Sequence, residues 1–210
     1  LGADWTPWDE VASEVADHAR VFAYSRPGYG ASDATTAPRD PARIVHELRA
    51  LLRSEGQSPP YVLVGHSTGA GYMELFAKAH PEEVIGLVLV DPRHRDFLST
   101  CTKAGIETCG IPDSALEGLP AVERDEYVAY AQVSDQIRAA GTFGDYPVLV
   151  LGATEHSMSP AWESLWRSML ETLAAETDQG RWIPFEGADH YLQNDRPRDV
   201  ARHIIELLPR

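Results

Sequence analysis

The chain has 210 residues, of which 43% are hydrophobic and 24% charged, a balance typical of one globular domain with a substantial core. Its formal net charge of -14 disfavours nucleic acid and anionic membrane surfaces as partners, because both would repel it. No apolar run approaches the roughly 20 residues of a transmembrane helix, and no Cys or His pairs have the spacing of a zinc site. We therefore expect neither a metal nor a transmembrane segment.

The first quarter of the chain predicts two helices joined by a strand and a loop. Residues 5–18 carry apolar side chains at spacings of three and four, the pattern of an amphipathic helix. Residues 20–24 are predicted to form a short strand, and residues 26–32 a loop rich in Gly and Pro. A second helix is predicted over residues 40–55, where an Asp-Pro pair provides a favourable start.

The stretch from Tyr61 to Gly71 contains the most informative motif. Four residues typical of a strand lead into Gly-x-Ser-x-Gly, and a helical pattern follows. This context predicts a sharp strand-to-helix turn with Ser67 at its centre. Gly65 and Gly69 are expected to avoid clashes that a Cβ atom would cause. At the N-terminus of a helix, Ser67 would be a nucleophile beside free N–H groups that favour negative charge.

Strand and helix patterns alternate over the rest of the chain, apart from one interruption. The alternation predicts an α/β fold with a doubly wound, mostly parallel sheet and flanking helices. The polar segment at about 93–143 is broken by Gly and Pro, and it is predicted to be a small helical lid inserted into a single domain of residues 1–210. The other expected elements are strands at 84–90, 147–151 and 181–185 and helices at 160–175 and 197–208.

A serine nucleophile needs a base, and the base needs a carboxylate to orient it. His190 is the expected base, because it follows the last predicted strand and comes last in the order Ser, acid, His. Glu155 and Asp91 both stand at strand ends and compete as the acid, since open α/β sheets place their sites at that edge. We prefer Glu155, because Asp91 could instead serve the turn into Pro92, and both stay open.

These motifs together resemble the α/β-hydrolase superfamily, specifically its lid-bearing branch of esterases and lipases. The resemblance implies a serine hydrolase that cleaves a small-molecule carboxylic ester, or a related acyl compound, through an acyl-enzyme and without a cofactor. It leaves the acid open, because members place it after either strand. The alternatives are a ligand-binding member without hydrolytic activity and an inactive truncated fragment. The matching segments are the loop at 26–32, the elbow at 65–69, Asp91-Pro92, Glu155 and the loop at 187–190.

The same resemblance implies that N-terminal strands of the family are missing here. The lost strand would lie between the segments at 20–24 and 61–64, so we expect these two either to pair directly or to leave a marginally stable sheet. Leu1 and Gly2 would stand at the exit of the family's oxyanion turn, where one N–H of the oxyanion hole belongs. The N–H of Thr68 would supply the other.

The two cysteines, Cys101 and Cys109, both fall in the predicted lid. They form either a small disulfide loop or two unrelated thiols. We expect the disulfide, since a chain with only two cysteines has placed both in one loop-like stretch. Disulfides persist in oxidising compartments, so the bridge would indicate an exported protein and two free thiols a cytoplasmic one.

Overall fold

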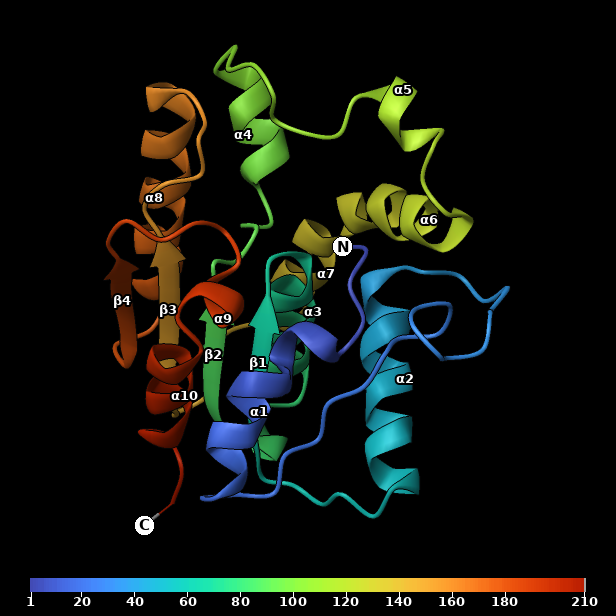
Figure 1. The fold of residues 1–210 in the computed structure, drawn as a ribbon, viewed down its shortest axis with the longest axis vertical. Helices are drawn as coiled ribbons and strands as arrows, with labels where there is room; N and C mark the ends of the chain where they lie inside the picture. Colours follow the sequence, from blue (N-terminus) through green and yellow to red (C-terminus); the bar gives the residue numbers. More distant parts are fainter. Residues whose placement is uncertain (210) are drawn as a thin grey trace.

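The computed structural model, which describes residues 1–209, contains a four-stranded parallel sheet (Figure 1). Its strands are β1 (Tyr61–His66), β2 (Val84–Val90), β3 (Val148–Ala153) and β4 (Gly180–Phe185). They run in the order β1-β2-β3-β4 across the sheet, all parallel, and this is also their order along the chain. β2 and β3 are buried on both faces, which explains their continuous apolar runs. The predicted strands at these four places are confirmed.

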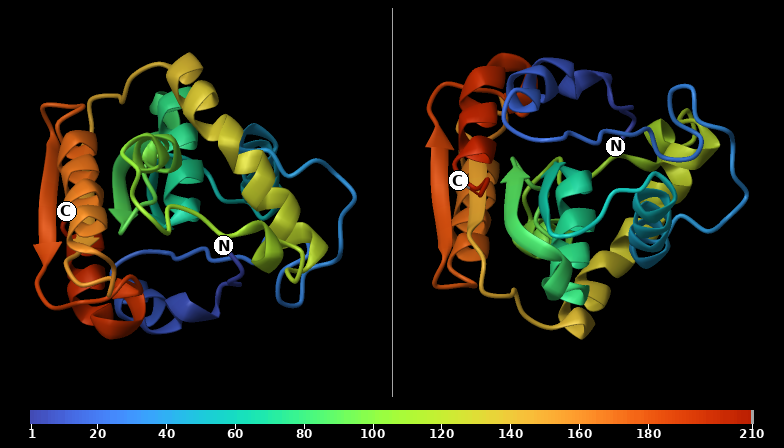
Figure 2. Two further views of the ribbon diagram at one scale, coloured as in Figure 1. Left: turned by 90° about the horizontal axis from the view of Figure 1, so that it is seen from above. Right: turned by 90° about the horizontal axis from the view of Figure 1, so that it is seen from below.

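Helices cover both faces of the sheet and give the molecule three layers (Figure 2). The principal helices are α1 (Asp9–Ala16), α2 (Pro41–Ser54), α3 (Thr68–Ala79), α8 (Pro160–Ala174) and α10 (Pro197–Ile205). α3 and α8 contact the strands from one face, α1 and α10 pack together on the other, and α2 packs against α3. Alternate residues of β2 feed the two cores, Leu87 and Leu89 into one and Val88 and Val90 into the other. The predicted doubly wound α/β fold is therefore confirmed.

Two helices begin where their cap residues predict. The Asp40 carboxylate accepts a hydrogen bond from the N–H of Arg43 at 3.1 Å, directly before the proline that opens α2. Ser159 caps α8 in the same way through the N–H of Trp162, at 3.3 Å. The helix expected at 5–18 is shorter, because a 3₁₀ turn, η1 (Thr6–Trp8), precedes α1.

The strand predicted at 20–24 does not form. Phe22 and Tyr24 pack against the core, but within residues 1–209 the backbone of this segment makes no hydrogen bond to other backbone groups. A strand exists only as part of a ladder, and β1 is the edge of the sheet, with β2 as its single neighbour. Direct pairing of this segment with β1, one of the two expected outcomes, is therefore absent, and side-chain packing holds the segment in place. The other outcome, a marginally stable sheet, stays a prediction.

The segment inserted between β2 and β3 contains four short helices. These are α4 (Phe97–Lys103), α5 (Asp113–Leu116), α6 (Ala121–Ala129) and α7 (Val133–Ala140), with a 3₁₀ turn, η3 (Tyr130–Gln132), before α7. α4, α5 and α6 lie beyond the carboxyl ends of the strands (Figure 1), whereas α7 contacts α3 and α2. The remaining short elements are η2 (Pro81–Glu83) and α9 (Leu192–Asp195). Among the helices of residues 1–209, none has both the length and the hydrophobicity needed to cross a bilayer.

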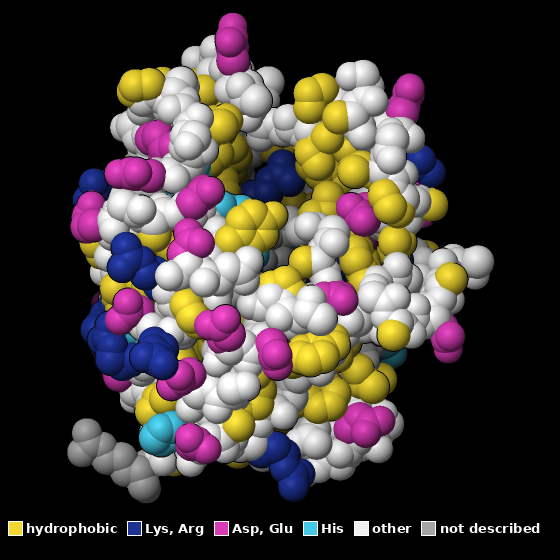
Figure 3. Space-filling model, in the orientation of Figure 1, with side chains coloured by type: hydrophobic (Ala, Val, Ile, Leu, Met, Phe, Trp, Pro, Cys, Tyr) yellow, Lys and Arg dark blue, Asp and Glu magenta, His cyan; other side chains and the backbone are white. Residues whose placement is uncertain are grey.

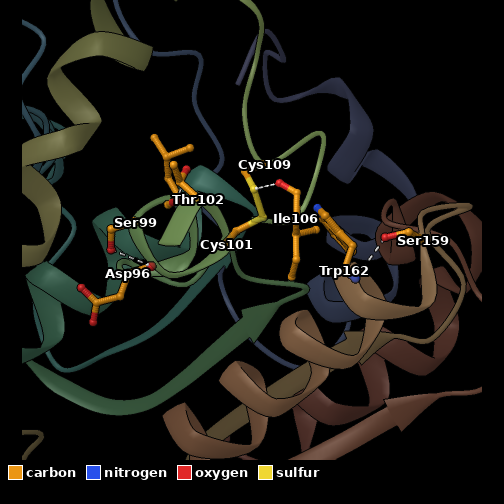
Figure 4. Close-up of a disulfide and its surroundings, with 9 residues drawn as sticks. Asp96, Ser99, Cys101, Thr102, Ile106, Cys109, Ser159 and Trp162 are labelled. Carbon is orange, nitrogen blue, oxygen red and sulfur yellow. Dashed lines mark hydrogen bonds between the residues drawn. A yellow bond between two sulfur atoms is a disulfide. The ribbon is translucent and has the colours of Figure 1, made fainter. Parts of the chain in front are cut away.

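A disulfide between Cys101 and Cys109 closes the loop after α4 (Figure 4). The two Cα atoms are 5.7 Å apart. Cys101 is fully buried and belongs to the same core cluster as Trp162 of α8. The expected bridge is thus present, and it fastens α4 and its following loop together beside α8. The export that such a bridge would indicate stays a prediction.

One carboxylate attaches α6 to the loop at residues 26–32. Glu126 has no exposed surface. Its oxygens accept hydrogen bonds from the guanidinium of Arg26 at 3.1 and 2.9 Å, from Arg39 at 3.2 Å and from the Tyr29 hydroxyl at 2.9 Å. Burial alone would lower the pKa of Arg26, but Glu126 outweighs burial and raises it, so the guanidinium stays charged. α6 is therefore held by a buried, mutually neutralising group of charges.

Candidate active site

Ser67 occupies the strained turn that the motif predicts. β1 ends at the preceding residue, α3 begins at the following one, and Ser67 itself has φ 54° and ψ −122°. A non-glycine residue in this region costs about 1–3 kcal/mol and is typical of functional sites. A Cβ at Gly65 would lie 2.7 Å from the carbonyl oxygen of Gly69, so Gly65 is required. A Cβ at Gly69 would meet nothing within 4 Å, and the clash expected there is wrong.

Residues that directly follow β1 or stand after β4 and β2 bring a serine, a histidine and a carboxylate into hydrogen-bond contact with one another. The Ser67 hydroxyl lies 3.0 Å from Nε2 of His190, which follows β4. Nδ1 of the same imidazole lies 2.5 Å from Oδ2 of Asp91, which follows β2. The ends of parallel strands meet at one edge of the sheet, and this explains why residues so far apart in sequence converge. The arrangement is that of a nucleophile, a base and an orienting acid.

The structure selects Asp91 rather than Glu155 as the partner of His190. Asp91 has φ 39°, and its N–H donates to the carbonyl oxygen of Leu151 at 2.7 Å, so the turn after β2 directs the carboxylate between β2 and β3. Glu155 is exposed, and its side chain makes no hydrogen bond or ion pair within residues 1–209. The preference for Glu155 is therefore wrong, because its position after β3 directs its side chain to solvent.

The carboxylate of Asp91 is fully buried and accepts four hydrogen bonds. Oδ2 receives those of His190 and His156, the latter from Nε2 at 2.8 Å. Oδ1 receives the N–H of Ala153 and the indole N–H of Trp166, both at 3.1 Å. Burial alone would raise the pKa of Asp91, but the hydrogen bonds and charges of the two histidines lower it to about 2. The carboxylate is therefore ionised throughout the physiological range.

His156 is the functional-site residue that sequence reasoning missed. The sequence marks it only as a loop residue next to Glu155, but its imidazole turns inward and links two carboxylates. Nε2 contacts Asp91, and Nδ1 lies 2.8 Å from Oε2 of Glu163. Burial alone would lower the pKa of His156, yet the hydrogen bonds and charges of Asp91 and Glu163 raise it above its ordinary value. The signal that could have marked it was its place three residues after the end of β3, beside an acid candidate.

His66 supports the loop that carries His190. Its Nε2 lies 2.8 Å from the carbonyl oxygen of His190 and therefore acts as the hydrogen-bond donor. Burial, reinforced by the nearby His190, lowers the pKa of His66 to about 3, so its ring is neutral at physiological pH. Tyr191 packs beside both imidazoles, with ring centroids 5.3 Å from each. These contacts fix the His190 backbone while its ring reaches Ser67.

Of the groups expected in the oxyanion hole, Thr68 is the one that the structure places directly beside Ser67. Thr68 is the first residue of α3, and within residues 1–209 its N–H makes no backbone hydrogen bond. The first residues of the described chain lie beyond the carboxyl ends of the strands (Figure 1). Gly2 has φ 78° and faces Glu123 of α6. The roles of Thr68, Leu1 and Gly2 as donors to an oxyanion stay predictions.

Asp91, His156 and His190 also form a group that could hold a metal ion, with ligand atoms within 4.8 Å of one another. Their atoms already meet at hydrogen-bond distances of 2.5 and 2.8 Å. Oδ2 of Asp91 is thus occupied by two imidazole groups, and we assign no metal to it.

A model of the alpha/beta hydrolase family matches residues 1–203. The chain belongs to the alpha/beta hydrolase family. YqjL of Bacillus subtilis, an uncharacterised protein, is 27% identical over 208 residues, which cover 98% of this chain and 78% of YqjL. A protein of the same superfamily from Gibberella zeae is 31% identical over 88 residues, or 40% of this chain and 27% of that protein. These relatives confirm the family without identifying a substrate for this hydrolase.

Solved structures agree with the fold of this α/β hydrolase. An esterase from Thermogutta terrifontis, solved with malate bound, has a TM-score of 0.66 and 19% identity over 97% of this chain and 84% of the esterase. A monoacylglycerol lipase from Paleococcus ferrophilus has a TM-score of 0.66 and 18% identity over 99% of this chain and 92% of the lipase. At such identities the likeness shows the fold alone, so the chemistry of this hydrolase must be argued from its site.

Proposed function

We propose that this α/β hydrolase cleaves a carboxylic ester, or a related acyl compound, by using Ser67, His190 and Asp91 as nucleophile, base and acid. The observation that carries the proposal is the position of the His190 imidazole, whose two nitrogens lie 3.0 Å from the Ser67 hydroxyl and 2.5 Å from the Asp91 carboxylate. The esterase and the lipase with the same fold support an ester as the substrate.

The first half of the reaction forms an acyl-enzyme. Oγ of Ser67 attacks the carbonyl carbon while Nε2 of His190 takes the hydroxyl proton. Asp91 accepts a hydrogen bond from Nδ1, which holds the imidazole in the tautomer that can receive this proton and stabilises the imidazolium that forms. The tetrahedral intermediate collapses when His190 delivers the proton to the leaving alcohol, and the acyl group stays on Ser67.

The second half repeats these roles with water. His190 removes a proton from a water molecule, the resulting hydroxide attacks the acyl carbon, and the proton returns to Oγ of Ser67 as the carboxylic acid leaves. In both halves the negative charge on the carbonyl oxygen needs donors. The free N–H of Thr68 at the N-terminus of α3 is one such donor in this proposal, and the first residues of the described chain are the other.

The decisive experiment tests Ser67 directly. Wild-type protein should hydrolyse p-nitrophenyl butyrate and react with a fluorophosphonate probe at Ser67. Ser67→Ala should abolish the labelling and lower kcat by about 10⁴-fold or more. Ser164→Ala, a change at an exposed serine of α8, serves as the matched control and should behave like wild type. Labelling that persists in Ser67→Ala would exclude Ser67 as the nucleophile.

The same experiment separates the two alternatives to a hydrolase. A ligand-binding member of the fold would be labelled at Ser67 but would turn over no ester, because an activated serine alone does not make a productive site. An inactive fragment would be neither labelled nor cooperatively folded. The assembled Ser67–His190–Asp91 geometry favours the hydrolase over both.

A further inference from the structure

The triad carboxylate is shared between two imidazoles. Nε2 of His156 and Nδ1 of His190 both bind the same oxygen, Oδ2 of Asp91. A triad needs only one of these contacts, and the second binds an oxygen whose partner oxygen, Oδ1, already receives two other donors. The position of His156 is therefore not explained by the proposed catalytic steps.

A second carboxylate holds His156 in this position. Oε2 of Glu163 lies 2.8 Å from Nδ1 of His156, and Oε1 accepts the backbone N–H of the same residue at 2.9 Å. The ring also contacts Trp162 and Trp166, with centroids 5.0 and 5.4 Å away. Within residues 1–209, the titratable groups that face His156 are Asp91, Glu163 and the imidazole of His190. Two of these groups are anions, so the site favours a protonated His156.

We infer that His156 is a positioning residue that shares Oδ2 of Asp91 with His190 and thereby keeps the hydrolase active toward acidic pH. The inference rests on the proposed function. A protonated His156 between Asp91 and Glu163 offsets part of the negative field that the carboxylate exerts on His190. Protonation of His190 then becomes less favourable, and the imidazole remains a base at lower pH than it would beside an unshared carboxylate.

The size of the effect follows from the geometry. The two imidazole centroids are 6.0 Å apart. With an effective dielectric constant of about 20, a unit charge at this distance corresponds to roughly 1 to 2 pH units. Loss of the charge should therefore move the acidic limb of the kcat/KM profile up by about that amount.

The test compares three variants with wild type. His156→Gln retains an N–H donor for Asp91 but carries no charge, so the acidic limb should shift to higher pH while the plateau changes less than about threefold. His156→Leu also removes the donor, so the same shift should come with a lower plateau. Glu163→Gln should shift the limb in the same direction by less. Glu171→Gln, an exposed change on the same helix, is the control and should leave the profile unchanged.

A second readout does not depend on turnover. NMR titration of Cε1 of His190 should show the same upward displacement of its midpoint in His156→Gln. If wild type hydrolyses no ester but this displacement is observed, the proposed function fails and the coupling stands. If His156→Gln leaves both the acidic limb and the titration midpoint unchanged, His156 is only a packing residue and the inference is overturned.

A separate observation concerns Arg93, which lies between the nucleophile and the inserted segment. Its backbone N–H donates to the carbonyl oxygen of Ser67 at 3.2 Å. Its guanidinium lies 5.2 and 5.6 Å from the ring centroids of Tyr127 and Tyr130. Figure 3 shows a hollow on this face, between the two lobes of the molecule, with basic side chains on its floor.

Arg93 lacks the partner that comparable arginines have. In this chain of 32 acidic and 18 basic residues, other partly or fully buried arginines such as Arg26, Arg39 and Arg95 pair with carboxylates. Within residues 1–209, Arg93 makes no ion pair, and its side chain donates no hydrogen bond. A partly buried guanidinium, on a residue whose backbone is hydrogen-bonded to that of Ser67, thus presents free donors that suit an anionic oxygen group.

We propose that Arg93 binds a carboxylate carried by the ester substrate. The net charge of -14 repels a phosphate dianion more strongly than a carboxylate monoanion, which favours the carboxylate. This proposal also rests on the proposed function, because it assigns a substrate class to the same site. The substrate could carry this carboxylate in its acyl group or in its alcohol group, and the test has one arm for each case.

The test compares matched substrates. Wild type should prefer the mono-p-nitrophenyl ester of glutaric acid over p-nitrophenyl valerate in the first arm. In the second arm it should prefer carboxymethyl valerate over propyl valerate, whose alcohol is uncharged. Arg93→Met should lower the anionic-to-neutral ratio of kcat/KM by about 10- to 100-fold in one arm, and Arg93→Lys should retain part of it. Arg167→Met, at an exposed arginine of α8, should leave the ratio unchanged.

Binding supplies a readout without turnover. Glutarate should bind the Ser67→Ala protein in calorimetry and lose affinity when Arg93→Met is added. If wild type hydrolyses no ester but this Arg93-dependent binding is observed, the proposed function fails and the anion site stands. Equal ratios for wild type and Arg93→Met in both arms, or tighter binding of glycerol 3-phosphate than of glutarate, would overturn the proposal.

Discussion

Replacement of Asp91 by asparagine tests which carboxylate orients His190. The change keeps the shape of the side chain but leaves one acceptor oxygen where the carboxylate has two. If the amide oxygen keeps the N–H groups of Ala153 and Trp166, the amide nitrogen faces the two imidazoles. Nδ1 of His190 must then accept a hydrogen bond, and the imidazole proton moves to Nε2, where it prevents uptake of the Ser67 proton.

The expected loss is about 10⁴-fold in kcat, because the wrong tautomer of the base is the main defect. This factor corresponds to about 5.5 kcal/mol of activation free energy. The assay is hydrolysis of p-nitrophenyl butyrate with kcat and KM determined separately, and near-ultraviolet circular dichroism verifies the fold of the variant. Glu155→Gln is the matched control, and since Glu155 is exposed it should stay within about twofold of wild type.

Two outcomes would refute this reasoning. Asp91→Asn could retain more than a tenth of the wild-type kcat, which would mean that the contact between Asp91 and His190 does not set the tautomer. Glu155→Gln could lose 10³-fold or more, which would mean that Glu155 reaches His190 during the reaction. After either result, the choice between Asp91 and Glu155 as the acid would again be open.

Three further predictions concern stability. Glu126→Gln leaves the buried guanidinium groups of Arg26 and Arg39 without their anion, so it should lower the free energy of unfolding by about 3–5 kcal/mol and Tm by about 6–20 °C in calorimetry. Its control is Asp125→Asn, an exposed change on the same helix, which should change Tm by less than about 2 °C. Replacing both Cys101 and Cys109 by serine opens a loop with a sequence separation of 8, which should cost about 2.5 kcal/mol in urea unfolding, and dithiothreitol should destabilise wild type but not this variant. Asp91 has a pKa of about 2 in the folded protein, below its ordinary value of 3.8. Its ionisation therefore contributes about 2–3 kcal/mol to the free energy of unfolding above pH 4, and this contribution is lost as the pH falls toward 2. The prediction fails if, between pH 4 and pH 2, the free energy of unfolding of wild type declines no more steeply than that of Asp91→Asn.

Local sequence context was sufficient for the strands, for Ser67 and for His190. The apolar runs of β2 and β3 are long enough to be recognised without their neighbours, and Gly65 and Ser67 define a turn whose geometry few other sequences allow. His190 could be found because it follows the last strand and closes the expected order. The strands and the turn at Ser67 are determined by interactions between residues close in sequence, whereas His190 was found from its order along the chain, since its partners Ser67 and Asp91 are distant in sequence.

The residues that sequence analysis misjudged depend on contacts between distant elements. Asp91 and Glu155 both end strands, and only the direction of the turn after each strand decides which carboxylate faces His190. His156 is defined by Asp91 and by Glu163, which belong to different elements. Residues 20–24 have the composition of a strand, but their backbone forms no hydrogen bonds with a neighbouring strand. None of these outcomes follows from periodicity or composition.

The bridge and the buried Glu126 leave the two ends of one stretch of the inserted segment with different freedom from its middle. The bridge at Cys101 and Cys109 fixes one end of the segment, and the buried Glu126 fixes the other. Between them lie residues 110–125, and α5, a helix of 4 residues in the middle of this span, buries none of its side chains. A movement of α6 away from the loop at 26–32 would break the buried ion pairs of Glu126 with Arg26 and Arg39, whereas the bridge joins two residues of the segment and moves with it. We therefore expect any motion of this segment that admits a substrate to be confined to the span around α5, and bulky esters to be poor substrates of the proposed esterase.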